Sequence, residues 1–185
     1  MNPSPKSWNF YSAGILLAGA LWIAVSARLP GALAAPTLPA PQAGFLAPEF
    51  TLQTPEGETI ALADLRGHPV LLNLWASWCG PCRAEMPAMQ RVYEDYRDLG
   101  LVILAVNATD QDSAAAAVAF ANDLGLTFPI LLDLDGAVGR QYALRALPSS
   151  YFIDANGVIQ EVVIGGPMAE ALLRTRIENL LGQVP

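Results

Sequence analysis

Residues 73–87 have the sequence NLWASWCGPCRAEMP, and this stretch contains both cysteines of the 185-residue chain, Cys79 and Cys82. The apolar run from Leu71 to Trp75 predicts a buried strand, and helical spacing begins just after Cys79. The unpaired N–H groups and the dipole of a helix N-terminus favour a thiolate, so Cys79 is the predicted nucleophile. Pro81 fits the first helical turn, and Cys82, one turn deeper, is the predicted resolving thiol.

Two cysteines three positions apart can form a reversible disulfide, and the chain has no third cysteine to make a structural bridge. The alternatives are two unrelated buried cysteines or half of a zinc site. A zinc site needs four ligands, and the chain offers two sulfurs and one histidine, His68, in a Gly-His-Pro turn that we expect to face solvent. We therefore predict a two-electron redox switch.

An uncharged apolar stretch extends from Phe10 to Ala27, between Lys6 and Arg28. Its length is near the minimum for a spanning helix, so we expect a cytoplasmic N-terminus at 1–9 and an uncleaved transmembrane signal-anchor at 10–27. The alternative is a cleaved signal peptide, because residues 25–27 have a small-x-small pattern. In both cases the remainder of the chain is exported. With the uncleaved anchor, we expect a single-pass membrane protein with its catalytic domain on the extracytoplasmic side.

Residues 28–43 are rich in proline and alanine and predict a linker that leads to a catalytic domain at 44–185. An extended chain from Pro30 to Pro48 would span about 60 Å at the polyproline rise. The formal net charge is −7, and all 17 acidic residues lie after Gly44. Such a domain is a poor partner for nucleic acid or an anionic lipid surface.

Strand and helix patterns alternate from Phe45 onward, which predicts an α/β domain with a central mixed sheet flanked by helices. The stretches 50–53 and 59–62 flank a Pro-Glu-Gly turn and predict an N-terminal hairpin. Further strands are expected at 70–75, 101–106, 128–132, 150–153 and 158–164. Helices are expected at 80–99 with a kink at Pro87, at 113–124, at 137–142 and at 167–181, the last with Ala169, Leu173, Ile177 and Leu180 on its core face.

These motifs, together with LPSSYFID at residues 147–154, resemble the thioredoxin superfamily. The similarity is to the membrane-tethered TlpA/ResA-like thiol-disulfide oxidoreductases of bacteria, a group related to the peroxiredoxins of the AhpC/TSA type. It covers about residues 45–181. The resemblance implies a thioredoxin fold with an N-terminal hairpin and a central strand-helix insertion between Val102 and Leu132.

The resemblance also implies roles for single residues. Pro148 matches the family's cis-proline, which lies against the Cys79–Cys82 redox disulfide and leaves the Leu147 backbone free to pair with an extended substrate. With Leu147, the residues around the cysteines that we assign to substrate contact are Trp78, Gly80 and Pro81. Glu85 matches an acidic residue that assists proton transfer; the alternative is a solvated first-turn acid favoured by the helix dipole.

Asn73 departs from the pattern of thioredoxins proper, which carry a buried aspartate six residues before the first cysteine and a nearby lysine. An asparagine cannot take a proton, and the domain has no lysine. Deprotonation of Cys82 must therefore use Glu85 or water, or have no assisting group.

The predicted function is a tethered extracytoplasmic thiol-disulfide oxidoreductase that acts as a reductant. The Gly-Pro pair between its cysteines is found in reducing thioredoxins, whose potential is about −270 mV, against about −120 mV for the oxidant DsbA. Expected partners are exported protein dithiols and disulfides, such as apocytochrome c, and an unidentified membrane electron donor. No cofactor and no metal is expected.

Three other functions are compatible with parts of this pattern. An oxidase or isomerase of secreted proteins would use the same cysteines at a higher potential. A Cu(I) delivery module would use them as soft ligands, but His68 lies on the wrong side of the motif to complete such a site. A peroxidase is disfavoured, because the peroxidatic cysteine of the related enzymes is not followed by a second cysteine three residues on.

Overall fold

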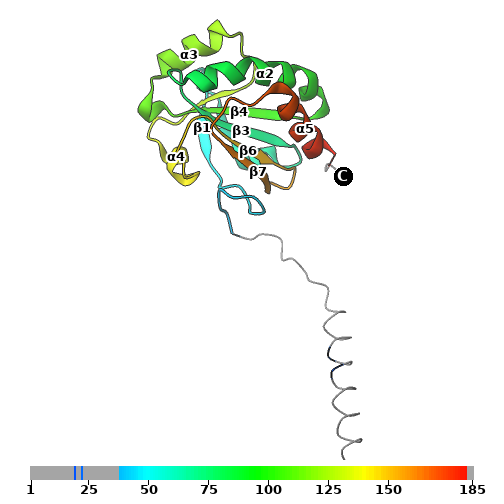
Figure 1. Cartoon of the computed structure of the whole chain (residues 1–185). Helices are drawn as coiled ribbons and strands as arrows, with labels where there is room; N and C mark the ends of the chain where they lie inside the picture. Colours follow the sequence, from blue (N-terminus) through cyan, green and yellow to red (C-terminus); the bar gives the residue numbers. More distant parts are fainter. Residues whose placement is uncertain (1–18, 20–21, 23–37, 183–185) are drawn as a thin grey trace, which may run out of the picture. The chain divides into compact units, whose positions relative to one another are not determined.

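The computed structural model describes residues 19, 22 and 38–182, and residues 38–182 lie within one compact unit of the chain, Pro36–Pro185 (Figure 1). No helix among the described residues is long and apolar enough to cross a membrane. The predicted anchor at 10–27 lies outside these residues except for Gly19 and Trp22, as does most of the predicted linker. Both therefore stay predictions.

A mixed sheet forms the centre of the described domain, with its seven strands in the order β2-β1-β5-β4-β3-β6-β7. The central strands β3, β4 and β5 are parallel, whereas both edges of the sheet are antiparallel. The strands are β1 (Thr51–Gln53), β2 (Thr59–Ala61), β3 (Val70–Trp75), β4 (Val102–Asn107), β5 (Ile130–Leu132), β6 (Ser149–Ile153) and β7 (Ile159–Ile164). The predicted hairpin and mixed sheet are confirmed.

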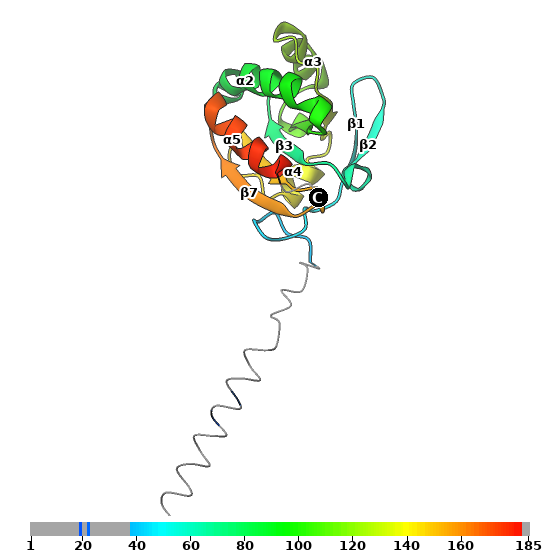
Figure 2. The ribbon, with the colours of Figure 1, turned by 90° about the vertical axis from the view of Figure 1, so that its right-hand side faces the viewer.

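Helices cover both faces of this sheet. They are α2 (Gly80–Tyr96), α3 (Ala114–Asp123), α4 (Ala137–Gln141) and α5 (Glu170–Leu181), with short 3₁₀ turns η1 (Leu62–Leu65), η2 (Arg97–Leu99) and η3 (Thr109–Gln111). Figures 1 and 2 both show α5 beside α2, and the buried residues of α2, α3 and α5 belong to one core cluster. Val138 of α4 belongs to a second cluster.

The alternation of side chains along β3 assigns them to these two clusters. Leu71 and Trp75 pack with α2, α3 and α5, whereas Val70, Leu72 and Leu74 pack on the side of α4. Every residue of β3 is buried, as expected for a central strand with both faces covered. The same alternation places Asn73 on the α2 face, in line with Leu71 and Trp75.

Helix α2 begins directly after Cys79, which is its N-cap residue, and Pro81 lies in its first turn. The helix continues through Pro87 as one element to Tyr96, so the missing N–H of the proline does not end it. Gly100, with φ of 97°, ends the η2 turn that follows, because a left-handed conformation costs glycine little. Met86, Met89 and Val92 of this helix are fully buried in the core.

The closing helix differs from its prediction at its start. It begins at Glu170 instead of residue 167, and Ala169 is an exposed N-cap residue, so its assignment to the core was wrong. The backbone N–H of Met168, just before this helix, donates to the carboxylate of Glu85 in α2. This hydrogen bond holds the segment that leads into α5 against α2. Leu173, Ile177 and Leu180 are buried as predicted.

Candidate active site

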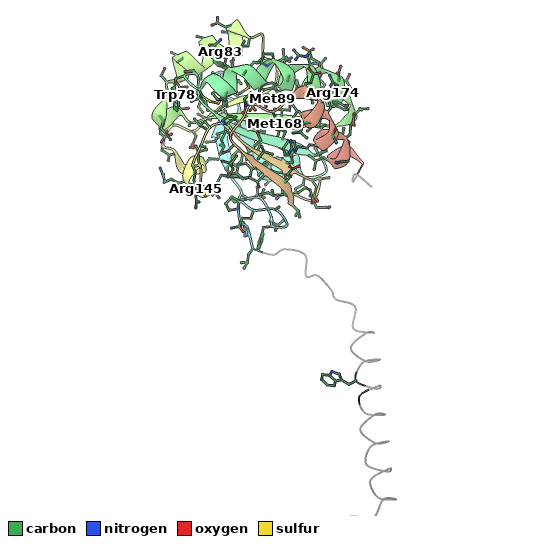
Figure 3. All side chains as sticks on the ribbon, viewed as in Figure 1. Trp78, Arg83, Met89, Arg145, Met168 and Arg174 are labelled. Carbon is green, nitrogen blue, oxygen red and sulfur yellow. A yellow bond between two sulfur atoms is a disulfide. The ribbon has the colours of Figure 1, made fainter. Side chains whose placement is uncertain are left out.

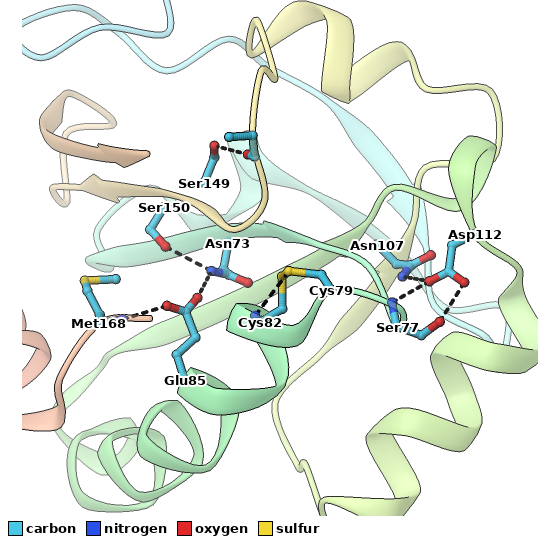
Figure 4. Close-up of a disulfide and its surroundings, with 11 residues drawn as sticks. Asn73, Ser77, Cys79, Cys82, Glu85, Asn107, Asp112, Ser149, Ser150 and Met168 are labelled. Atoms are coloured by element: carbon cyan, nitrogen blue, oxygen red, sulfur yellow. Dashed lines mark hydrogen bonds between the residues drawn. A yellow bond between two sulfur atoms is a disulfide. The ribbon is translucent and has the colours of Figure 1, made fainter. Parts of the chain in front are cut away.

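The sulfur of Cys79 is bonded to that of Cys82, with the two Cα atoms 5.3 Å apart. The backbone N–H of Cys82 donates to Cys79 Sγ over 3.2 Å, as the close-up in Figure 4 shows. Cys79 is 5% exposed and Cys82 is fully buried. A first-turn N–H therefore already points at the outer sulfur, where it would stabilise a thiolate after reduction.

The loop before Cys79 is held by a carboxylate that sequence reasoning missed. The backbone N–H and the hydroxyl of Ser77 donate to Asp112 over 2.6 and 2.7 Å, and Asn107 Nδ2 donates to it over 2.9 Å (Figure 4). Burial raises the pKa of Asp112, but the hydrogen bonds from Asn107 and Ser77 outweigh this and lower the pKa below its usual value. Asp112 therefore stays charged and fixes the loop that presents Cys79.

A groove of about 320 Å³ opens over Cys79. Trp78 is 60% exposed at its edge, and its indole N–H donates to the carbonyl of Gln111 over 3.0 Å. Figure 3 shows Trp78 and Arg145 on the same side of the domain. The lining consists of residues on either side of the disulfide: Trp78, Cys79, Gly80 and Pro81 from the start of α2, and Leu144, Arg145, Ala146 and Leu147 with Gln111 opposite. All four residues that we assigned to substrate contact therefore line one groove.

The Leu147–Pro148 peptide bond is cis in this structure. The carbonyl of Pro148 accepts a hydrogen bond from the N–H of Gly165 over 2.8 Å. Within the described part of the chain, neither the N–H nor the C=O of Leu147 has a hydrogen-bond partner. Because Leu147 lines the groove, its backbone groups are available to an extended segment of a substrate.

Glu85 is buried, with 1% of its surface exposed, and lies in the second turn of α2, so the alternative of a solvated first-turn acid was wrong. Its Oε1 accepts from Asn73 Nδ2 over 2.9 Å and its Oε2 from the N–H of Met168 over 3.0 Å (Figure 4). Burial raises the pKa of Glu85, and the hydrogen bonds from Met168 and Asn73 offset only part of this. The side chain is therefore a buried acid that can hold a proton.

Gly166 lies directly against this acid. A Cβ added there would be 2.8 Å from Pro148 Cγ and 3.0 Å from Glu85 Oε2. The sequence offered no signal for this contact beyond the Gly-Gly-Pro turn, because it joins three segments that are far apart in the chain. The 165–168 turn therefore packs closely against both Pro148 and Glu85.

His68 is exposed, and its Nδ1 lies 3.2 Å from the carbonyl oxygen of Gly100, away from the cysteines. In residues 38–182, no three His, Cys, Asp or Glu side chains are placed to hold a metal ion. The cysteines are instead engaged with each other, which is the arrangement for thiol-disulfide exchange.

Known proteins are similar to this chain in sequence and in fold. The sequence model of the AhpC/TSA family matches residues 43–162. The thioredoxin-like protein YneN of Bacillus subtilis is 45% identical over 125 residues, which is 67% of this chain and 72% of YneN. The thiol-disulfide oxidoreductase ResA of Oceanobacillus iheyensis is 39% identical over 145 residues, which is 76% of this chain and 72% of ResA.

Among solved structures, a secreted Mycobacterium tuberculosis disulfide oxidoreductase homologous to E. coli DsbE aligns with a TM-score of 0.66 and 26% identity. The alignment covers 71% of this chain and 96% of that one. Together with the disulfide at the start of α2, these matches identify the domain as a thioredoxin fold. The chain belongs to the AhpC/TSA family and is, within the thioredoxin superfamily, a TlpA/ResA-like protein-disulfide oxidoreductase.

Proposed function

We propose that this oxidoreductase is tethered to the cell membrane by residues 10–27 and reduces disulfides of exported proteins, such as apocytochrome c, on the extracytoplasmic side. The observation that carries the exchange activity is the Cys79–Cys82 pair at the N-terminus of α2, which opens onto a groove where the Leu147 backbone is unpaired among the described residues. The Gly-Pro pair between the cysteines supports the reductive direction. The apolar N-terminal stretch supports export, and so does the likeness to a secreted relative.

The exchange begins with Cys79, the outer sulfur. Its thiolate attacks one sulfur of the substrate disulfide, forms a mixed disulfide and releases the other substrate sulfur as a thiolate, which takes a proton from water. The backbone of Leu147 pairs with the substrate segment next to its cysteine, and Pro148 keeps that segment against Cys79.

The second step uses the buried pair. Cys82 loses its proton to Glu85, and its thiolate attacks Cys79 Sγ, so that the Cys79–Cys82 disulfide forms and the second substrate thiolate leaves. Two electrons have then passed from the enzyme to the substrate. A dithiol of a membrane electron donor must restore the reduced form.

The test measures the reduction potential of the full chain by equilibration with dithiothreitol, together with its rate of reduction of a disulfide-bonded Cys-x-x-Cys-His peptide. We expect a potential nearer to about −270 mV than to about −120 mV. Cys79→Ser should abolish turnover, and Cys82→Ser should accumulate the mixed disulfide. A potential near that of DsbA would refute the reductive role and identify an oxidant.

A further inference from the structure

Asn73 carries a buried oxygen that has no partner in the described part of the chain. Its Nδ2 donates to Glu85 Oε1 and to Ser150 Oγ, each over 2.9 Å, and the residue is fully buried. Its Oδ1, also buried, accepts no hydrogen bond from any described residue. Buried polar atoms without partners are rare in folded proteins, so this oxygen requires an explanation.

The carboxamide lies between two groups that can each hold a proton. Asn73 is on the face of β3 that α2 covers, and Cys82 and Glu85, three residues apart in α2, lie on one face of that helix. Figure 4 shows the nitrogen of Asn73 toward Glu85 and its oxygen toward Cys82. In the disulfide form Cys82 has no proton to donate, whereas reduction gives it an S–H group.

We propose that Asn73 is a positioning residue whose carboxamide flips to couple the protonation of Cys82 to that of Glu85, an inference that rests on the proposed function. When Glu85 is a carboxylate, Nδ2 donates to it and Oδ1 accepts from the Cys82 thiol. When the proton has left Cys82 and is held on Glu85, the flipped amide accepts from the carboxylic acid through Oδ1 and donates to the thiolate through Nδ2. In the first arrangement Oδ1 and both hydrogens of Nδ2 have partners; in the second Oδ1 accepts from Glu85 and Ser150, and Nδ2 donates to the thiolate. Each arrangement holds one proton.

The surroundings permit this flip. The hydroxyl of Ser150 accepts from Nδ2 in one orientation and donates to Oδ1 in the other. The other ionisable groups on this part of α2 are Cys79 and Arg83, whose guanidinium lies over the Phe120 ring, 4.5 Å from its centroid. Strands β3 and β6 contribute the neutral Asn73 and Ser150. From α5, Arg176 reaches Met168 Sδ at 3.4 Å, but its charge is paired with Glu161.

The test titrates the Cys82 thiol in the Cys79→Ser full chain, where it is the only thiol, by the ultraviolet absorbance of its thiolate. Glu85→Gln imitates the protonated acid: the glutamine must accept from Met168, so its amide donates toward Asn73 and selects the flipped orientation. We expect this substitution to lower the pKa of Cys82 by about 1 unit or more. In an Asn73→Leu background, which cannot transmit the orientation, the same substitution should lower it by less than half as much.

Ser150→Ala is the matched control, because its hydroxyl only follows the flip, and the full effect of Glu85→Gln should persist in it. An equal lowering in the Asn73→Leu background would overturn the inference, since a direct charge effect then suffices. If Asn73→Leu does not fold, NMR decides on the Cys79→Ser chain alone: the Asn73 side-chain amide should respond to the ionisation of Cys82 as well as to that of Glu85, and a response to Glu85 alone would also overturn the inference. These titrations involve no substrate, so a failed coupling leaves the reductase assay standing, and a failed assay leaves the coupling testable.

Discussion

Gly166→Ala tests whether Gly166 packs against Pro148 and Glu85 as described. The added methyl group would lie 2.8 Å from Pro148 Cγ, 3.2 Å from Pro148 Cδ and 3.0 Å from Glu85 Oε2. Ordinary contact between carbon atoms begins at about 3.5 Å, so the proline ring must move by about 0.7 Å or the 165–168 turn must shift. Overpacking of this kind costs about 1–3 kcal/mol of unfolding free energy.

The neighbouring Gly165→Ala is the control. Apart from its two chain neighbours, no described residue has an atom within 4 Å of the Cβ it would add, and its φ of +82° gives it a backbone cost alone, about 1–2 kcal/mol. Urea unfolding should show a loss of stability for both variants, but only Gly166→Ala displaces Pro148 or Glu85. Only that variant should therefore slow disulfide exchange with a peptide substrate. An unchanged unfolding midpoint together with a wild-type exchange rate for Gly166→Ala would refute the packing argument.

Three further outcomes are expected. Folding raises the pKa of Glu85 above its usual value of 4.5, so its protonated form contributes stability at a pH below 4.5, and this contribution is lost as the pH rises through the folded pKa. Glu85→Gln lacks this loss and should gain stability relative to the parent as the pH increases from 4.5 to about 8. A stability difference that stays constant in urea titrations across this range would contradict the raised pKa. In the reduced chain, iodoacetamide should label Cys79 well below the pH at which a free thiol reacts and leave Cys82 protected, and mass spectrometry showing faster labelling of Cys82 would reverse their roles. The full chain should stay in the membrane fraction through a carbonate wash, whereas a mature N-terminus mapped at Arg28 would identify a cleaved signal peptide.

The sequence alone was sufficient for the fold and the redox pair, because both depend on local patterns. A continuous apolar strand, a helix start with Pro81 in its first turn and two cysteines three residues apart determine where the thiols lie on α2. The alternation of strands and helices then predicts the mixed sheet, and the Leu147–Pro148 pair could be placed beside the disulfide through its resemblance to a family motif.

The protonation chemistry of the site depended on tertiary packing. Sequence patterns could not distinguish a solvated Glu85 from a buried one, since its environment is made by Asn73 of β3, Pro148 before β6 and the 165–168 turn. The same holds for Asp112, which is 35 residues from Ser77 in the chain. Burial and long-range hydrogen bonds set the charge of a carboxyl, and they exist only when distant segments meet, so the sequence located the two sulfurs and the folded structure decided how their protons are handled.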